Sequence, residues 1–376
     1  MIIGIDGNEA NIEKRVGVNT YAYELLKGFH KLQDSQNFTQ SFVIYLREKP
    51  RPDLPKETRQ WKYQILSGSG LWIIKSLTPY LWRNPDKIDV FFTPSHYTPP
   101  FISIPRVCSV MDLGYLMFTE QFKRKDYWQL KYWTAYSVKI SKYILSISKA
   151  TTSDIQKHYP NAKNKIKTIY LAYDSDVYTP KLPRSHINKV KSHYAITKNY
   201  ILFLSTLKPN KNVEGLLRAW SLIEERYQDT ILVITGKKGW LFKPIFDLVE
   251  KLQIKNRVVF TDYLPEEDKP YLIGGAKVFV LPSFWEGFGL DVLNAYACGI
   301  PAVVSDRASL PEVAGNPGIY INPEDSKDIA SGIEKVLTMS QEEYNKLAQK
   351  CISQAHKFSW EKTVEQTLKI IELAAK

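Results

Sequence analysis

The chain has 376 residues, of which 44% are hydrophobic and 24% charged, and its formal net charge at pH 7 is +12. This length allows two α/β domains with separate cores, and the composition is ordinary for a globular protein. No apolar run approaches the roughly 18 residues that a membrane-spanning helix needs, and the first residues resemble a strand rather than a signal peptide. We therefore predict a cytoplasmic protein whose positive charge favours an acidic partner.

Two classes of site are disfavoured by the sequence. The lysines are spread along the chain without a zinc-finger or RNP signature, so we predict no nucleic-acid partner. Cys108, Cys298 and Cys351 stand apart without the spacing of metal ligands, which predicts reduced, partly buried thiols and no metal site.

Short β-branched runs alternate with longer amphipathic segments along the whole chain. The predicted strands are residues 2–5, 42–46, 90–93, 106–110, 143–147 and 166–170, and then 201–204, 231–235, 258–261, 278–281, 302–305 and 319–321. Near-continuous apolar strands separated by helices predict parallel sheets covered on both faces, and this number of strands exceeds one comfortable sheet. We therefore predict two Rossmann-like α/β domains.

The domain boundary is predicted within residues 174–199, which carry two Thr-Pro or Leu-Pro steps and several lysines but no strand pattern. This gives domains at residues 1–175 and 176–357, followed by an amphipathic helix at 358–376 with Ser359 as its N-cap. Open α/β domains bind ligands at the carboxyl ends of their strands. Two such domains facing each other form a cleft, where an active site is expected.

The most informative stretch begins after the apolar run 278–281, where Ser283-Phe-Trp-Glu286-Gly-Phe-Gly289 leads into a helical pattern. A strand thus delivers an acidic residue and a Gly-x-Gly turn to the start of a helix. The glycines let a ligand approach the backbone, and the amides at a helix N-terminus attract anions. Glu286 is suited to accept hydrogen bonds from hydroxyls, so we predict a site for an anionic, hydroxyl-rich ligand.

The residues from Glu286 to Pro301, Glu-Gly-Phe-Gly-Leu-Asp-Val-Leu-Asn-Ala-Tyr-Ala-Cys-Gly-Ile-Pro, resemble the Glu-x7-Glu signature of the retaining family-4 (group 1) glycosyltransferases. Further stretches match in the order of that family, over nearly the whole chain: 3–6 with 15–21, 94–100 with 109–115, 206–212, 236–240, 260–265 and 358–363. The resemblance implies the GT-B fold, in which two Rossmann-like domains face each other across a cleft and the C-terminal helix crosses back to the first. It assigns the acceptor to residues 1–175 and the nucleotide sugar to 176–357.

The resemblance implies that Glu286 contacts the hydroxyls of the donor sugar and that Lys211 neutralises the leaving diphosphate. Without the family, Glu286 is interpreted as a helix-capping carboxylate and Lys211 as a solvated loop lysine. No Asp-x-Asp of the type found in metal-dependent GT-A glycosyltransferases is visible, which favours a metal-independent reaction. The other donor-binding positions that the resemblance implies are Gly17, Thr206, Gly236, Leu264, Phe288, Gly289, Leu290 and Asn294.

The chain departs from the family at two of these motifs. In the family, Asp112 forms part of a His-Asp pair, but the histidine position is occupied here by Met111, and a thioether cannot replace an imidazole. His96 is a second acceptor-side histidine that can compensate, although a packing role is an equal interpretation. Asn294 stands where a glutamate clamps the ribose, and its neutral hydrogen bond is weaker. One hypothesis is a 6-deoxy sugar or a deoxyribose nucleotide as the donor.

Aromatic residues make up 13% of the chain, and tryptophans and tyrosines lie beside lysines in residues 61–83 and 122–143. This pattern suits an anionic membrane surface that carries a lipid-linked acceptor. The alternative is core packing with a solvated outer face.

We therefore predict a retaining, metal-independent hexosyltransferase that needs no cofactor beyond its nucleotide-sugar donor. Its acceptor is the hydroxyl of a glycan or a lipid-linked sugar, in the synthesis of cell-surface polysaccharide or glycolipid. The main alternative is a non-catalytic sugar-nucleotide binder, which Met111 and Asn294 favour. An epimerase on the same fold also remains open, whereas a dehydrogenase is disfavoured because Gly4-Ile-Asp-Gly7 is not Gly-x-Gly-x-x-Gly.

Overall fold

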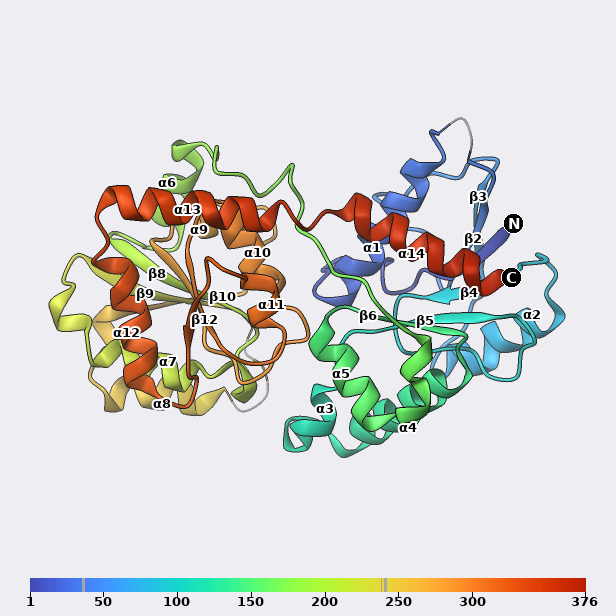
Figure 1. Ribbon diagram of the computed structural model, residues 1–376, viewed down its shortest axis with the longest axis horizontal. Helices are drawn as coiled ribbons and strands as arrows, with labels where there is room; N and C mark the ends of the chain where they lie inside the picture. The colour runs from blue at the N-terminus through green and yellow to red at the C-terminus, as the bar shows by residue number, and fades with distance from the viewer. Residues whose placement is uncertain (36–37, 238, 240–241) are drawn as a thin grey trace. The chain divides into compact units, whose positions relative to one another are not determined.

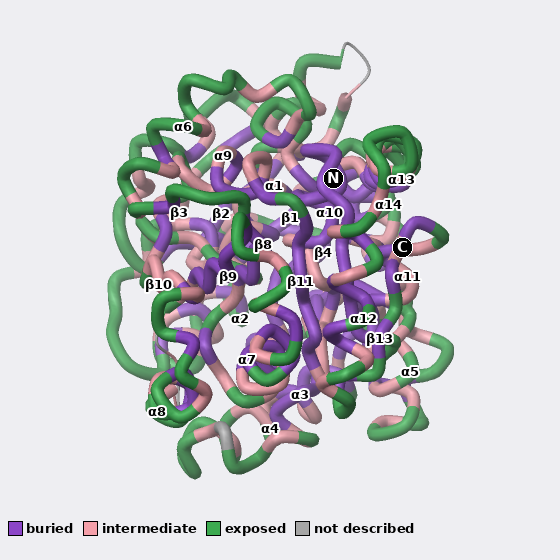
Figure 2. The backbone as a smooth tube through the Cα atoms, turned by 90° about the vertical axis from the view of Figure 1, so that its left-hand side faces the viewer, coloured by how far each residue is buried: buried purple, intermediate pink, exposed green. Residues whose placement is uncertain are grey.

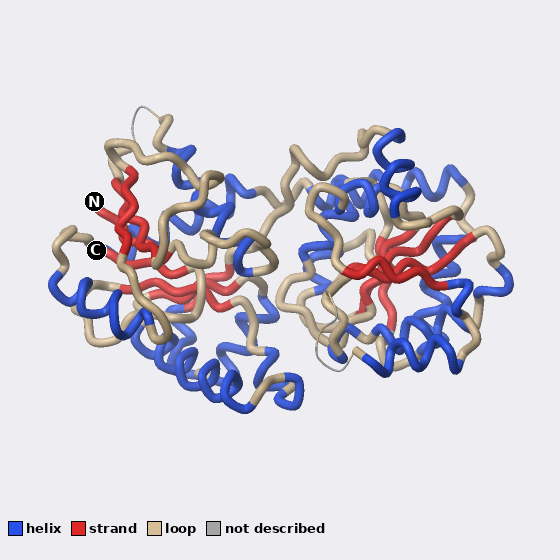
Figure 3. The backbone as a smooth tube through the Cα atoms, turned by 180° about the vertical axis from the view of Figure 1, so that it is seen from behind, coloured by secondary structure: helices blue, strands red, loops and turns tan. Residues whose placement is uncertain are grey.

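The computed structural model describes residues 1–35, 38–237, 239 and 242–376, and the chain forms two compact units (Figure 1). Unit 1 contains Met1–Met117, Phe122–Leu171 and Trp360–Lys376, and unit 2 contains Phe118–Gln121 and Ala172–Ser359. Each unit is a parallel β-sheet with helices on both of its faces (Figure 3). The buried segments in Figure 2 follow the strands, as expected for parallel sheets that are covered on both sides.

The sheet of unit 1 has seven strands in the order β3-β2-β1-β4-β5-β6-β7, and every pairing is parallel. The strands are β1 (Ile2–Asp6), β2 (Ser41–Leu46), β3 (Trp61–Ile65), β4 (Val90–Thr93), β5 (Arg106–Val110), β6 (Tyr143–Ser146) and β7 (Ile166–Thr168). The helices are α1 (Val18–Leu32), η1 (Ile73–Leu77), α2 (Thr78–Arg83), α3 (Gly114–Met117), α4 (Arg124–Ile140), α5 (Lys149–His158), η3 (Pro160–Lys165) and α14 (Trp360–Ala375), with the short turn η2 (Thr119–Gln121) in unit 2.

The edge strand β3 was not predicted from the sequence. Its residues, Trp-Lys-Tyr-Gln-Ile, alternate apolar and polar side chains, which is typical of a half-buried strand. Trp61 is fully buried, and Trp72 is 2% exposed in a core cluster with Leu77 and Leu81. Of the two interpretations of residues 61–83, core packing therefore applies to these two tryptophans, which pack inside unit 1.

The sheet of unit 2 has six strands in the order β10-β9-β8-β11-β12-β13, and all of its pairings are parallel. The strands are β8 (Asn199–Leu204), β9 (Thr230–Thr235), β10 (Val258–Asp262), β11 (Val278–Leu281), β12 (Ala302–Ser305) and β13 (Ile319–Ile321). The α-helices are α6 (Arg184–His193), α7 (Val213–Ser221), α8 (Lys243–Lys251), α9 (Lys269–Gly274), α10 (Leu290–Ala297), α11 (Leu310–Ala314), α12 (Ser326–Leu337) and α13 (Gln341–Ala355). Single turns occur at η4 (Pro209–Lys211), η5 (Glu224–Arg226) and η6 (Lys255–Arg257).

In each sheet the strand order reverses once, between β1 and β4 in unit 1 and between β8 and β11 in unit 2. The connections that leave these neighbouring strands run to opposite faces of the sheet, so their carboxyl ends open a crevice in which ligands bind. In unit 2 the loop with Lys211 follows β8 and the loop with Glu286 follows β11. In unit 1 the loop with Gly17 follows β1 and His96 follows β4.

The last helix, α14, belongs to unit 1 although unit 2 precedes it in the chain. It packs beside α1 (Figure 1), where a Cβ atom on Gly28 would overlap the side chain of Val364. Thr363 Oγ1 donates a hydrogen bond to the carbonyl oxygen of Tyr170 at 2.8 Å. The helix begins at Trp360, directly after the predicted cap Ser359. Among the described helices, none is both long and apolar enough to cross a membrane.

We expect Gly28→Ala to lower the free energy of unfolding by about 1–3 kcal/mol, because the added methyl overfills the contact between α1 and α14. Urea denaturation followed by tryptophan fluorescence measures this loss. Val364→Ala removes the methyl groups that meet the new Cβ, so the double variant should be less destabilised than the sum of the two single variants. Strict additivity would contradict the close contact between these helices.

Candidate functional site

The crevice of unit 2 holds an ion pair between the two residues that the sequence singled out. Lys211 Nζ lies 2.7 Å from Glu286 Oε1, and the two side chains are 16% and 12% exposed. Ser283 Oγ donates a hydrogen bond to the same carboxylate oxygen at 2.8 Å. Lys211 is therefore not a solvated loop lysine. The helix-cap interpretation of Glu286 does not apply either, because the N-cap of α10 is Gly289 and carries no side-chain cap hydrogen bond.

The loop that carries Glu286 is fixed by the strand beside it. Ser305 Oγ, at the end of β12, donates to the carbonyl oxygen of Ser283 at 2.6 Å. Ser309 Oγ donates to the carbonyl oxygen of Glu286 at 2.9 Å. These buried hydroxyls satisfy loop carbonyls that the sheet leaves unpaired. The backbone around Glu286 is thus held in place before any ligand binds.

The start of α10 presents backbone amides rather than side chains. Gly289 has φ 90°, which favours glycine, and a Cβ atom there would lie 2.6 Å from Leu310 Cδ2. The side chain of Phe288 is only 3% exposed and stacks edge-on against Phe358, with the ring centroids 5.9 Å apart. The first amides of a helix have no intrahelical acceptor, so those of Gly289 and Leu290 are suited to an anion.

Three strand ends meet at Gly236. A Cβ atom at this position would overlap the carbonyl oxygen of Ser205, and the Gly236 amide donates to the Asp262 carbonyl oxygen at 2.9 Å. The glycine therefore lets the ends of β8, β9 and β10 approach closely. Thr206 is exposed, whereas Leu264 is buried. Lys238 and Trp240, which belong to the predicted motif 236–240, lie outside the described residues.

Asn294 is 2% exposed, and its amide is used inside the protein. Asn294 Nδ2 donates to Asp291 Oδ1 at 2.9 Å, and Lys269 Nζ lies 2.8 Å from the same oxygen. Burial opposes the charged form of Lys269, but the carboxylate of Asp291 holds the pKa of Lys269 above its usual value. The sequence predicted Asn294 as a donor ligand without its neighbour Asp291, whose side chain is 22% exposed.

In unit 1 the predicted residues gather at the carboxyl ends of β1, β4 and β5. Gly17 is the N-cap of α1 with φ 54°, and a Cβ there would meet no atom of the described residues within 4 Å. Asp112 follows β5, is exposed, and accepts a hydrogen bond from the Gly114 amide at 2.8 Å. The carbonyl oxygen of Met111 accepts a hydrogen bond from Thr151 Oγ1 at 3.1 Å, which ties this loop to α5.

His96 is a half-buried histidine of unit 1. Its ring centroid lies 4.2 Å from that of Tyr97, and its Nε2 atom is buried without a hydrogen-bond partner among the described residues. Burial lowers the pKa of His96 to about 4. The imidazole is therefore neutral at physiological pH, with one nitrogen that donates and one that accepts.

Carboxylates that the sequence analysis did not select lie at the same edge of unit 1. Burial raises the pKa of Asp6, at the end of β1, and that of Glu9, where the charge of Asp6 adds to the effect. Burial, to which the charge of the nearby Asp112 adds, raises the pKa of Asp154, on α5, to about 6. Asp154 Oδ2 is buried without a partner in the described part of the chain. Asp6 and Glu9 could have been selected from the sequence, because they lie at or just after the carboxyl end of a predicted strand, where ligands bind in such folds.

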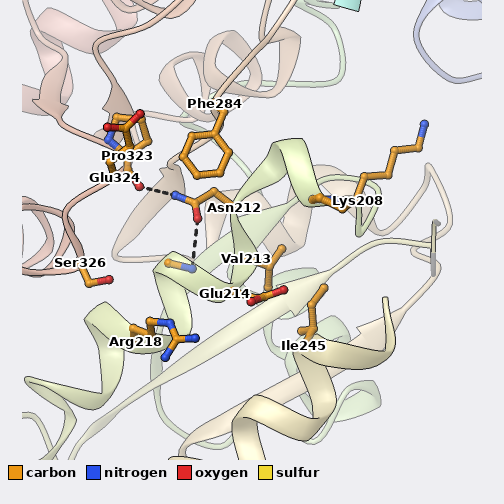
Figure 4. Close-up of a pocket in the computed structure, with 12 residues that line it drawn as sticks. Lys208, Asn212, Val213, Glu214, Arg218, Ile245, Phe284, Pro323, Glu324 and Ser326 are labelled. Carbon is orange, nitrogen blue, oxygen red and sulfur yellow. Dashed lines mark hydrogen bonds between the residues drawn. The ribbon is translucent and has the colours of Figure 1, made fainter. Parts of the chain in front are cut away.

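A cavity of about 430 Å³ lies beside the loop that carries Lys211 (Figure 4). Its lining includes Lys208, Asn212 and Phe284, together with Pro323 from the loop before α12, but neither Lys211 nor Glu286. The cavity is thus separate from the ion pair. In the described residues, no group of three or more His, Cys, Asp or Glu side chains is arranged to hold a metal ion.

We expect acid to destabilise the protein through His96. The unfolded chain takes up a proton near pH 6.5 but the folded chain only near pH 4, so the free energy of unfolding falls as the pH is lowered through this window. His96→Asn removes this dependence. The stability difference between wild type and variant should shrink between pH 7 and pH 4, by at most about 3 kcal/mol.

Urea titrations of both proteins at several pH values measure this difference. The comparison cancels the opposite contribution of Asp154, whose raised pKa favours folding as the pH falls below about 6. A stability difference that is constant over this range would show that the histidine is accessible to protons in the folded protein.

Known proteins resemble parts of this sequence. Residues 186–358 match the family model described as group 1 glycosyl transferases. The O-antigen chain mannosyltransferase B of Escherichia coli is 34% identical over 239 residues, which is 63% of this chain and 62% of that protein. The O-antigen chain mannosyltransferase RfbU of Salmonella typhimurium is 25% identical over 242 residues, or 64% of this chain and 63% of that protein. The match thus spans less than two thirds of either relative.

Solved structures resemble the whole chain. HepE of Anabaena, determined in complex with UDP and glucose, superposes with a TM-score of 0.75 and 16% identity over 99% of both chains. WaaG, a glycosyltransferase involved in lipopolysaccharide biosynthesis, gives a TM-score of 0.73 and 15% identity, also over 99% of both chains. At these identities the likeness shows the fold alone. The predicted fold class, GT-B with two Rossmann-like domains, is confirmed.

Proposed function

We propose that this protein transfers a hexose from a nucleotide-diphospho sugar to an acceptor hydroxyl, because residues 186–358 match the family model of the group 1 glycosyl transferases. The observation that carries the proposal is the pair of Lys211 and Glu286 at the strand-order reversal of unit 2, next to the N-terminus of α10. The lysine and the first amides of the helix suit the diphosphate of such a donor. The carboxylate suits the hydroxyls of its sugar.

In the proposed reaction the diphosphate binds between Lys211 and the first amides of α10. The bond between the anomeric carbon and the phosphate oxygen breaks, and the negative charge that develops on the diphosphate is stabilised by these fixed donors without a metal ion. Glu286, which Ser283 orients, accepts hydrogen bonds from sugar hydroxyls. The acceptor oxygen bonds to the anomeric carbon on the face that the diphosphate leaves, which retains the configuration, and a diphosphate oxygen takes its proton.

The acceptor is assigned to unit 1, with Asp112, His96 and Met111 on the side that receives it. The neutral imidazole of His96 and the exposed carboxylate of Asp112 suit hydroxyls, and Met111 belongs to the same loop as Asp112. Because two relatives are named as O-antigen mannosyltransferases, we propose a glycan or lipid-linked acceptor in cell-surface polysaccharide or glycolipid synthesis.

We also propose a peripheral contact with the anionic, cytoplasmic face of a membrane through α4. Trp128 and Tyr132 on this helix are 40% and 65% exposed, and their rings stack with centroids 5.4 Å apart. Lys131 Nζ lies 4.9 Å from the centre of the Trp128 ring. Exposed aromatic rings beside lysines suit the interface between lipid headgroups and acyl chains.

The test is a panel of UDP-, GDP-, ADP- and dTDP-sugars, scored for thermal stabilisation of the protein and for release of nucleoside diphosphate. We expect one donor to stabilise the protein and to be turned over. Lys211→Met should lower the release rate by roughly 100-fold or more, and Glu286→Gln by about 10-fold or more, because each removes a group that binds the reacting donor. Stabilisation without release, with any candidate acceptor, would instead indicate a non-catalytic binding protein.

The matched control is Lys255→Met, which breaks another lysine–glutamate pair. Lys255 Nζ lies 2.9 Å from Glu250 Oε1, but both side chains are more than half exposed at the surface. This variant should release diphosphate at the wild-type rate. Addition of EDTA should leave the rate unchanged, and a dependence on divalent metal would contradict the metal-independent part of the proposal.

A further inference from the structure

Asn212 follows Lys211 directly and has an unusual backbone conformation. Its φ of 55° and ψ of 42° lie in the left-handed region, which asparagine tolerates better than most residues. It is the N-cap of α7, and it is 7% exposed. The residue therefore ends the loop that carries Lys211 and begins the helix behind it.

The side chain of Asn212 joins three segments of unit 2. Its Oδ1 atom accepts a hydrogen bond from the Gly215 amide at 3.2 Å, which caps α7. Its Nδ2 atom donates to the carbonyl oxygens of Pro282 at 3.1 Å and of Pro323 at 2.6 Å. Pro282 directly precedes Ser283 in the loop that carries Glu286. Figure 4 shows the amide between α7 and the loop that contains Pro323.

The cavity beside this loop explains why these hydrogen bonds matter. About 430 Å³ of space borders Pro209, Asn212, Phe284 and Pro323, so side-chain packing does not fill the region behind the turn that ends at Lys211. One backbone hydrogen bond links the two loops directly, from the Phe284 amide to the Asn210 carbonyl oxygen at 2.9 Å. Asn210 Nδ2 adds a longer hydrogen bond to the carbonyl oxygen of Trp285 at 3.4 Å, and the amide of Asn212 adds the bonds to Pro282 and Pro323.

We propose that Asn212 is a positioning residue, which holds the turn so that Lys211 Nζ stays over Glu286. It acts through Lys211 and does not itself touch the donor. The consequence for catalysis rests on the proposed function of Lys211, whereas the placement of the lysine can be measured without any reaction. Nothing in the glycine or acidic signature of this site assigns such a role to the residue.

Two substitutions distinguish the bridge that Asn212 Nδ2 forms to Pro282 and Pro323 from simple capping of α7. Asn212→Gly retains access to the left-handed conformation but removes all three side-chain hydrogen bonds. Asn212→Asp retains an oxygen that can cap the Gly215 amide but loses both donors and places a carboxylate against two carbonyl oxygens. Capping alone predicts that the aspartate variant behaves as wild type. The bridge predicts that both variants are impaired.

The first measurement is the affinity for UDP and GDP by calorimetry, with kcat/KM for the donor that the panel identifies. We expect both variants to lose about 10-fold or more in affinity for the diphosphate that wild type binds, and in kcat/KM. In a Lys211→Met background, Asn212→Gly should change either value by less than 2-fold, since its effect passes through the lysine. Independent, additive losses would overturn the proposal.

The matched control is Asn84→Gly in unit 1. Asn84 is also a left-handed asparagine, with φ 45°, and its side chain makes two hydrogen bonds to the backbone of Ile88, at 2.9 and 3.1 Å. This variant loses comparable local contacts but should retain wild-type affinity and kcat/KM. An equal loss in this control would assign the effect to general destabilisation and overturn the proposal.

The second measurement needs no substrate. Trace labelling with acetic anhydride, followed by mass spectrometry, compares the reactivity of Lys211 with that of the exposed Lys255 in the same sample. Release of Lys211 from Glu286 should raise its relative labelling about 5-fold in both Asn212 variants. If wild type binds no nucleotide sugar, the proposed function fails, but this labelling still decides the role of Asn212. Unchanged labelling of Lys211 in the two Asn212 variants would overturn the proposed role of Asn212.

Discussion

The pairing of β8 with β11 is the constraint on which the candidate site depends. Val278 lies opposite Ile201, and Phe279 opposite Leu202, in a parallel register that places both carboxyl ends at one edge of the sheet. The chain leaves β8 and β11 with loops that end in Lys211 and Glu286, so the ion pair follows from the strand order. The glycine N-cap of α10 and the surrounding hydroxyls only refine a geometry that the sheet has already determined.

The ion pair fixes the positions of its two side chains more than it stabilises the folded protein. Both side chains are mostly removed from water, and the cost of desolvation offsets much of the attraction in such pairs. Each charge keeps the other in place, so neither side chain would have to be ordered on binding of the proposed diphosphate. A second pair, Lys269 and Asp291, lies in the first turn of α10, where Asn294 also binds the aspartate. The start of this helix thus carries two fixed carboxylates, Glu286 before it and Asp291 within it.

The sequence predicts this architecture because apolar runs and turns are local signals. It misses β3 because an edge strand buries only one side of its pleat, as Trp61 does, so its run is not continuously apolar. The proximity of Lys211 and Glu286 is predictable from strand ends, whereas the inward direction of the Asn294 amide is not, because periodicity does not identify hydrogen-bond partners. Asn212 gives only the local signal of a helix N-cap, because the two carbonyl oxygens that its Nδ2 atom reaches lie 70 and 111 residues away. The catalytic and binding roles of these residues remain predictions.

The side chains at the two strand-order reversals differ in charge. This difference suggests which kind of ligand each unit favours. In unit 2 a lysine and helix amides favour a phosphate group. In unit 1 burial raises the pKa values of Asp6, Glu9 and Asp154 and keeps His96 neutral. An edge rich in carboxyl groups disfavours phosphate but provides acceptors for hydroxyls. The same fold, used twice in one chain, therefore presents one crevice suited to an anionic donor and one suited to an uncharged sugar.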